Sequence, residues 1–84
     1  MNKILIEIIC PSLSRRWDFW AAVDVETSKV AATMISEICE YENDADIFKG
    51  FERIDLYNKS GMILNPEFTL RENGVHSGDS VMII

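Results

Sequence analysis

The side chains able to do nucleophilic or acid–base chemistry are few and lie far apart in the sequence. His76 is the only histidine, and it lies in a predicted turn with no serine or cysteine at a spacing that suggests a catalytic triad. A nucleophile–base pair would need the fold to bring His76 to Cys10 or Cys39, and both cysteines belong to apolar patterns typical of a core. We therefore predict no catalytic residue and no enzyme, and we interpret His76 as a solvated turn residue.

Acidic side chains gather in one segment, at Glu40, Glu42, Asp44 and Asp46. An EF-hand calcium loop needs a glycine at its sixth position and a glutamate at its twelfth. Counting from Asp44, these positions hold Lys49 and Asp55, so the motif fails. The two cysteines show no Cys-x-x-Cys spacing and have no histidine nearby, which predicts reduced, buried side chains. The sequence predicts neither a metal site nor a cofactor.

Charge and hydropathy narrow the choice of partners. Fourteen acidic and eight basic residues give a net charge of −6, which opposes binding to nucleic-acid phosphates and anionic lipids. Lys3, Arg15 and Arg16 form at most a small basic spot. No apolar run approaches the ~20 residues that span a bilayer, and no signal peptide is evident at the start. We expect a cytoplasmic protein that does not insert into a membrane and does not bind nucleic acid.

The elements that would position these residues begin with two strands. Residues 1–10 contain KILIEIIC, which alternates with period two; one face carries Ile4, Ile6, Ile8 and Cys10, the other Lys3, Leu5, Glu7 and Ile9. Pro11 and the polar residues after it predict a reversal. A second strand is expected over 17–25, because its odd positions are all apolar. This alternation leaves Trp20 pointing outward.

The rest of the chain predicts one helix and three further strands. The helix is expected to start with Thr27 or Ser28 as its cap and to end near Tyr41. An acidic loop follows, then strands over 51–58, 62–64 and 80–84. Thr69 and Glu72 form a capping-box pattern before Gly74, which predicts a single helical turn. The apolar first and last strands are expected to be central, parallel neighbours, so the last residues form a core strand.

This order of elements, together with TLRENGVHSGDSVMI over residues 69–83, resembles the ubiquitin-like β-grasp fold. The resemblance implies an α+β fold, a mixed sheet of four to five strands packed on one α-helix, with residues 1–84 as a single domain. Within this fold the chain is most similar to the YukD/EsaB-like family, small bacterial proteins that accompany type VII secretion systems. The similarity lies in Trp17-Asp18-Phe19 and in Gly61-Met62-Ile63-Leu64.

The resemblance implies a non-enzymatic protein–protein interaction module, an accessory or regulatory component of a type VII-like secretion system whose partners are secretion-apparatus components. One alternative is the N-terminal cytosolic domain of a larger membrane protein. A less favoured alternative is a modifier or sulfur carrier. Such proteins use a flexible Gly-Gly tail, whereas this chain ends with Met82-Ile83-Ile84, so this alternative requires that the tail has been removed. Ubiquitin's exposed aliphatic in its third strand is expected to correspond to Asp55, so receptors of ubiquitin should not recognise this chain.

The predicted partner-binding residues are Leu5, Ile9 and Trp20. Adjacent antiparallel strands bring such side chains within ~5–8 Å, and an exposed aromatic beside aliphatics is typical of a binding hot spot. Alternatively, a one-residue bulge could turn Trp20 inward. The same outer-face residues and an edge strand could equally support a homodimer.

Overall fold

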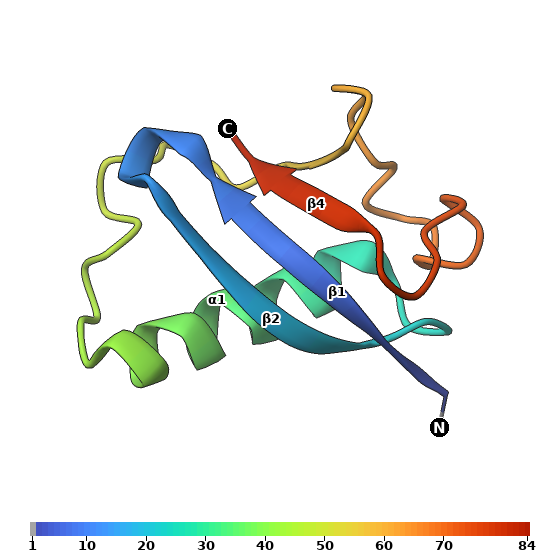
Figure 1. Cartoon of the computed structure of the whole chain (residues 1–84), viewed down its shortest axis with the longest axis horizontal. Helices are drawn as coiled ribbons and strands as arrows, with labels where there is room; N and C mark the ends of the chain where they lie inside the picture. Colours follow the sequence, from blue (N-terminus) through green and yellow to red (C-terminus); the bar gives the residue numbers. More distant parts are fainter. Residues whose placement is uncertain (1) are drawn as a thin grey trace.

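The computed structural model describes residues 2–84; Met1, which the predicted domain includes, lies outside the described residues. The elements are β1 (Lys3–Cys10), the 3₁₀ turn η1 (Pro11–Leu13), β2 (Arg15–Ala22), α1 (Thr27–Glu42), β3 (Leu56–Asn58) and β4 (Ser80–Ile83). The four strands form one sheet in the order β2-β1-β4-β3. Helix α1 crosses one face of this sheet, and β1 and β4 run in the same direction at its centre (Figure 1). This is the predicted α+β β-grasp arrangement.

Strands β1 and β2 pair along their whole length. Pro11 opens η1, and Ser14 closes it in the left-handed conformation with its N–H donating to the Pro11 carbonyl. The register is continuous and places Leu5 opposite Trp20, so no bulge interrupts it. Trp20 is therefore turned outward and 61% exposed, which confirms the predicted orientation. β2 ends at Ala22 rather than 25, because the Val23 carbonyl accepts from the Arg71 N–H of the loop that crosses there.

Helix α1 occupies the predicted range, but neither predicted cap is used. Glu26 is the N-cap residue and makes no side-chain capping bond. Instead, the N–H of Thr27 donates to the Phe68 carbonyl at 2.8 Å, and the N–H of Ser28 to the Pro66 carbonyl at 3.0 Å. The start of the helix is thus satisfied by a loop distant in sequence, which no local pattern announces.

The apolar stripe of α1 covers the sheet with Val30, Met34 and Ile38 buried. Cys10 is buried as predicted, whereas Cys39 is half-buried, so the prediction for Cys39 was wrong. The reason is that Cys39 lies at the margin of the apolar stripe of α1, close to the end of the helix, where the chain turns away at Asn43 in the left-handed conformation.

The segment between α1 and β3 is a series of turns that contributes to the core. Phe48 is buried and packs edge-to-face against Trp17, with ring centroids 6.0 Å apart, and against Phe51 at 5.7 Å. Because turns continue through Phe51, the strand predicted over 51–58 is reduced to Leu56–Asn58. The strand predicted over 62–64 is only a bridge between Tyr57 and Ile63, so the sheet has four strands.

The segment before β4 forms the predicted capping box. The N–H of Thr69 donates to Glu72 Oε1 at 2.9 Å, and the N–H of Glu72 donates back to Thr69 Oγ1 at 3.0 Å. The Asn73 amide nitrogen donates to Thr27 Oγ1 and so ties this turn to the start of α1. Strand β4 then runs parallel to β1, with Val81 and Ile83 fully buried. The apolar C-terminal run forms the predicted core strand as far as Ile83, whereas Ile84 lies outside β4 and is exposed.

Candidate interaction surface

The sheet face opposite α1 is the candidate site, and we call it the outer face. Successive side chains of a strand point to opposite faces of the sheet, so the residues that alternate with the buried ones belong to the outer face. Its side chains belong to Lys3, Leu5, Glu7, Ile9, Arg16, Asp18, Trp20, Ala22, Tyr57, Ser80 and Met82. The outer face therefore combines apolar residues with charged residues, and all of its charged residues lie on β1 and β2.

The structure brings together only two of the three predicted partner-binding residues. Leu5 and Trp20 are direct cross-strand neighbours. Ile9 lies four positions further along β1, roughly 13 Å away at the rise of a strand, and its β2 partner is Arg16. The single patch expected from the sequence is thus two separate apolar areas, because the pair Glu7–Asp18 lies between them.

The second apolar area contains residues that the sequence reasoning did not select. Met82 pairs with Ile9 on one side and with Tyr57 on the other. Asp55 lies one residue before β3, where it forms an ion pair with Arg53. Because β3 begins at Leu56, the outward side chain within this strand is Tyr57 rather than Asp55. The parallel β1–β4 pairing was predicted, but its register was not, and the register alone identifies Met82 as the neighbour of Ile9.

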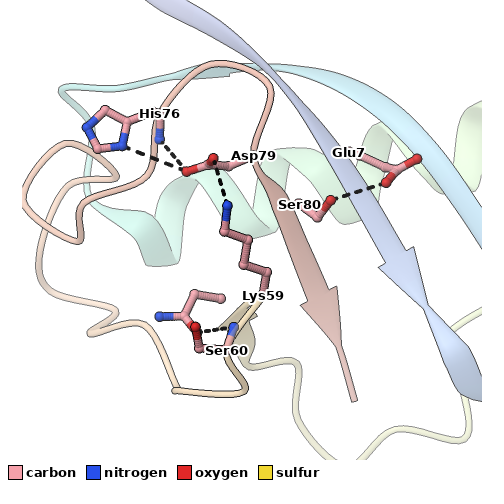
Figure 2. Close-up of polar contacts among 7 residues, drawn as sticks. Glu7, Lys59, Ser60, His76, Asp79 and Ser80 are labelled. Atoms are coloured by element: carbon pink, nitrogen blue, oxygen red, sulfur yellow. Dashed lines mark hydrogen bonds and ion pairs between the residues drawn. The ribbon is translucent and has the colours of Figure 1, made fainter.

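Polar contacts hold the middle of the outer face. Ser80 Oγ of β4 donates to Glu7 Oε1 of β1 at 3.2 Å (Figure 2), and Arg16 Nη1 of β2 donates to the other carboxylate oxygen at 3.3 Å. Arg15 is engaged by Glu42 at 2.8 Å. Both arginines of the predicted basic spot therefore face an acidic partner, and the spot offers little free positive charge.

Glu42 fastens the end of α1 to the edge strand β2. Trp17 Nε1 donates to Glu42 Oε1 at 2.7 Å, and Arg15 Nη1 donates to Oε2 at 2.8 Å. The hydrogen bond from Trp17 is the main cause that lowers the pKa of Glu42, the hydrogen bond from Arg15 adds to it, and desolvation opposes both. The contact is a structural clamp built around an ionised carboxylate.

In the part of the chain that the structure describes, no hydrogen bond joins His76 to Cys10 or Cys39. His76 lies on an exposed turn before β4, where its N–H donates to Asp79 Oδ2 at 2.8 Å and its ring nitrogen Nδ1 lies 3.8 Å from the same oxygen. Lys59 reaches the other oxygen of Asp79 at 3.9 Å, so this carboxylate organises the turn (Figure 2). Within residues 2–84, no three His, Cys, Asp or Glu side chains group as a metal site. The prediction of a solvated turn histidine is confirmed.

Comparisons with known proteins identify the fold. No family model and no curated protein matches the chain. Over 100% of its length the chain is similar to the "Ubiquitin-like domain of the mycobacterium tuberculosis type VII secretion system protein ECCD1", with 18% identity, 99% of that chain covered and a TM-score of 0.75. The EccD5 ubiquitin-like domain from Mycobacterium xenopi is similar over 100% of this chain and 94% of that one, with 17% identity and a TM-score of 0.79.

A third similar structure is a chain of the MycP5-free ESX-5 inner membrane complex. It is 14% identical over 100% of this chain, which spans 21% of that chain, and the TM-score is 0.77. At these identities the comparisons show the fold: the chain is ubiquitin-like.

In the described part of the chain, α1 is neither long nor apolar enough to cross a bilayer.

Proposed function

We propose that this chain is a non-enzymatic ubiquitin-like module that binds a protein of a type VII-like secretion apparatus in the bacterial cytoplasm. The observation that carries the proposal is the exposed Trp20 beside Leu5 on the outer face, since a large aromatic held on a rigid sheet is a typical anchor of protein interfaces. The cellular context comes from a structure with the same fold that is named as the ubiquitin-like domain of a type VII secretion system protein. An EccD5 domain and a chain of the ESX-5 inner membrane complex share this fold. The two free cysteines fit a reducing compartment.

A second candidate is the cytosolic domain of a larger membrane protein. It is favoured by the likeness to part of a much longer chain in an inner membrane complex, of which this chain spans 21%. An immunoblot of native lysate separates the two candidates, because the accessory protein would migrate as a species of 84 residues and the domain as a much larger one.

The experiment that tests the proposal is affinity capture from detergent-solubilised bacterial membranes. The wild-type chain, Trp20→Asp and Met62→Asp serve as baits, and quantitative mass spectrometry measures what each retains. Met62 is the matched control, because it is an apolar side chain of similar exposure, 67% against 61%, on the turn after β3.

We expect wild type and Met62→Asp to retain inner-membrane secretion components and Trp20→Asp to lose them at least tenfold. Equal retention by all three baits would contradict the role of Trp20. Capture of an adenylating enzyme in place of secretion components would contradict the secretion link and favour a modifier.

A further inference from the structure

The strand β2 presents an uncovered edge. It is the first strand in the sheet order β2-β1-β4-β3, and its only strand partner in residues 2–84 is β1. The N–H of Val23 donates to the carbonyl of Asn2, which lies opposite it. Backbone groups of successive residues point to opposite sides of a strand, so residues 21, 19, 17 and 15 also direct their N–H and C=O groups toward β1. The N–H and C=O groups of Arg16, Asp18 and Trp20 therefore point away from the sheet.

The opposite edge of the sheet is covered, which makes the β2 edge distinctive. The N–H of Asn58 in β3 donates to the Met62 carbonyl, and the N–H of Leu64 donates to the Leu56 carbonyl, both at 2.8 Å. Segment 62–64 thus takes up the outward bonds of β3. An exposed strand edge with free donors and acceptors is a template for another strand.

Beside the β2 edge lies a groove of about 860 Å³ between β2 and the second half of α1. Its apolar lining includes Phe19 and Ile38, both buried, and the strongly exposed Trp20 and Tyr41. Glu42, held by Trp17, also lines it. The groove thus offers apolar contacts alongside the free backbone groups of β2.

The charge of this groove selects its occupant. Among its lining acids, Asp18, Glu37 and Glu40 have no ion-pair partner in the described residues. Of its lining bases, Arg16 is already paired with Glu7 and only Lys3 is unpaired within residues 2–84, so the unpaired acids outnumber the unpaired base three to one. The groove is therefore acidic within a chain of net charge −6. A basic occupant is attracted, and a second copy of this chain, which carries the same acidic groove and net charge, is repelled.

We propose that the β2–α1 groove binds an extended peptide of alternating apolar and basic residues, which pairs with β2 as a fifth strand. Backbone hydrogen bonds to β2 supply affinity, and alternate side chains fill the apolar floor or meet the acidic rim. The edge from Arg16 to Ala22 spans roughly 23 Å, which matches about seven peptide residues. This inference rests on the proposed function as a protein-binding module but not on its link to secretion.

The test uses the intact chain and a blocked octapeptide probe of alternating valine and lysine. Backbone amide NMR shifts are followed at low salt, with an otherwise identical valine–glutamate peptide as the charge control. Two further probes carry N-methyl groups on all valines or on all lysines. Only one set of peptide N–H groups can face β2, so one methylated probe should bind at least tenfold more weakly than the other.

We expect the largest shifts at Arg16, Asp18 and Trp20, and at least tenfold weaker binding of the glutamate probe. The double variant Glu37→Lys/Glu40→Lys should weaken binding of the lysine probe at least tenfold. Its matched control, Glu52→Lys/Glu67→Lys, makes the same charge change at two exposed sites outside the groove and should change binding less than threefold.

Four results would overturn the inference. One is equal binding of both N-methylated probes, and another is equal binding of the lysine and glutamate probes. The third is a concentration-dependent dimer, without peptide, that shifts the same β2 amides. The fourth is that the largest shifts occur at Ile9 and Met82. That result would contradict peptide binding in the β2–α1 groove but not a binding module that uses the outer face. Membrane capture with Trp20→Asp tests the proposed function separately, so the two failures are distinguishable.

Discussion

At the scale of single residues, the most informative contact is the carboxylate of Glu42 between the indole of Trp17 and the guanidinium of Arg15. Two hydrogen bonds to its oxygens favour the ionised form and lower its pKa, although desolvation opposes them. Because the folded-state pKa lies below the unfolded one, this contact stabilises the fold above the ordinary glutamate pKa of ~4.3. That contribution is lost as the pH falls through the lowered value.

This contact predicts a shift that NMR can measure. Replacing Trp17 by Phe removes the strongest cause of the lowered pKa but keeps an aromatic ring in the core, so the pKa of Glu42 should rise. Arg15→Gln removes the cation beside the carboxylate and should raise this pKa as well. Carboxyl ¹³C titrations of the folded variants check both changes. An unchanged Glu42 pKa in Trp17→Phe would contradict the clamp.

At the scale of elements, the turn before β4 depends on a backbone conformation that favours glycine. Gly78 has φ of 89°, and its N–H donates to the Leu5 carbonyl at 2.7 Å, which joins the turn to β1. Gly78→Ala should lower the free energy of unfolding by roughly 1–2 kcal/mol, the cost of a left-handed conformation for an L-residue. No atom lies within 4 Å of the added Cβ, so the expected cost is conformational.

The matched control is Gly50→Ala, which also meets no neighbour within 4 Å and has no positive φ. Urea denaturation of the two variants should show a change within about 0.5 kcal/mol for Gly50→Ala. Equal effects of the two substitutions would show that Gly78 is not held in a glycine-specific conformation.

Elements whose signals are local were predictable from the sequence. Alternation gave β1 and the outward Trp20, and the reciprocal pattern of Thr69 and Glu72 gave the capping box. The start of α1 was predicted but its capping was missed, because the N–H groups of Thr27 and Ser28 donate to carbonyls of segment 66–68, a contact made only by the tertiary fold. The patch of Leu5, Ile9 and Trp20 was drawn as one because the sequence does not give the register of β1 against β2, which pairs Trp20 with Leu5 and not with Ile9.

At the scale of the whole molecule, charge and topology point to the same edge of the sheet. The chain leaves β2 open on one side, and Trp20 stands where that edge meets the outer face. An acidic chain with an open edge needs protection against pairing with its own copies, and its net charge of −6 supplies it by repulsion. Both proposed modes of binding therefore include Trp20.

The most direct test of this account is site-specific photocrosslinking in living bacteria. A photoreactive phenylalanine derivative placed at Trp20, and in parallel at the similarly exposed control position Met62, reports which surface touches another protein. We predict that position 20 yields a discrete adduct containing a secretion-apparatus protein and that position 62 does not. No adduct at position 20, or the same adduct at both positions, would contradict a binding surface centred on Trp20.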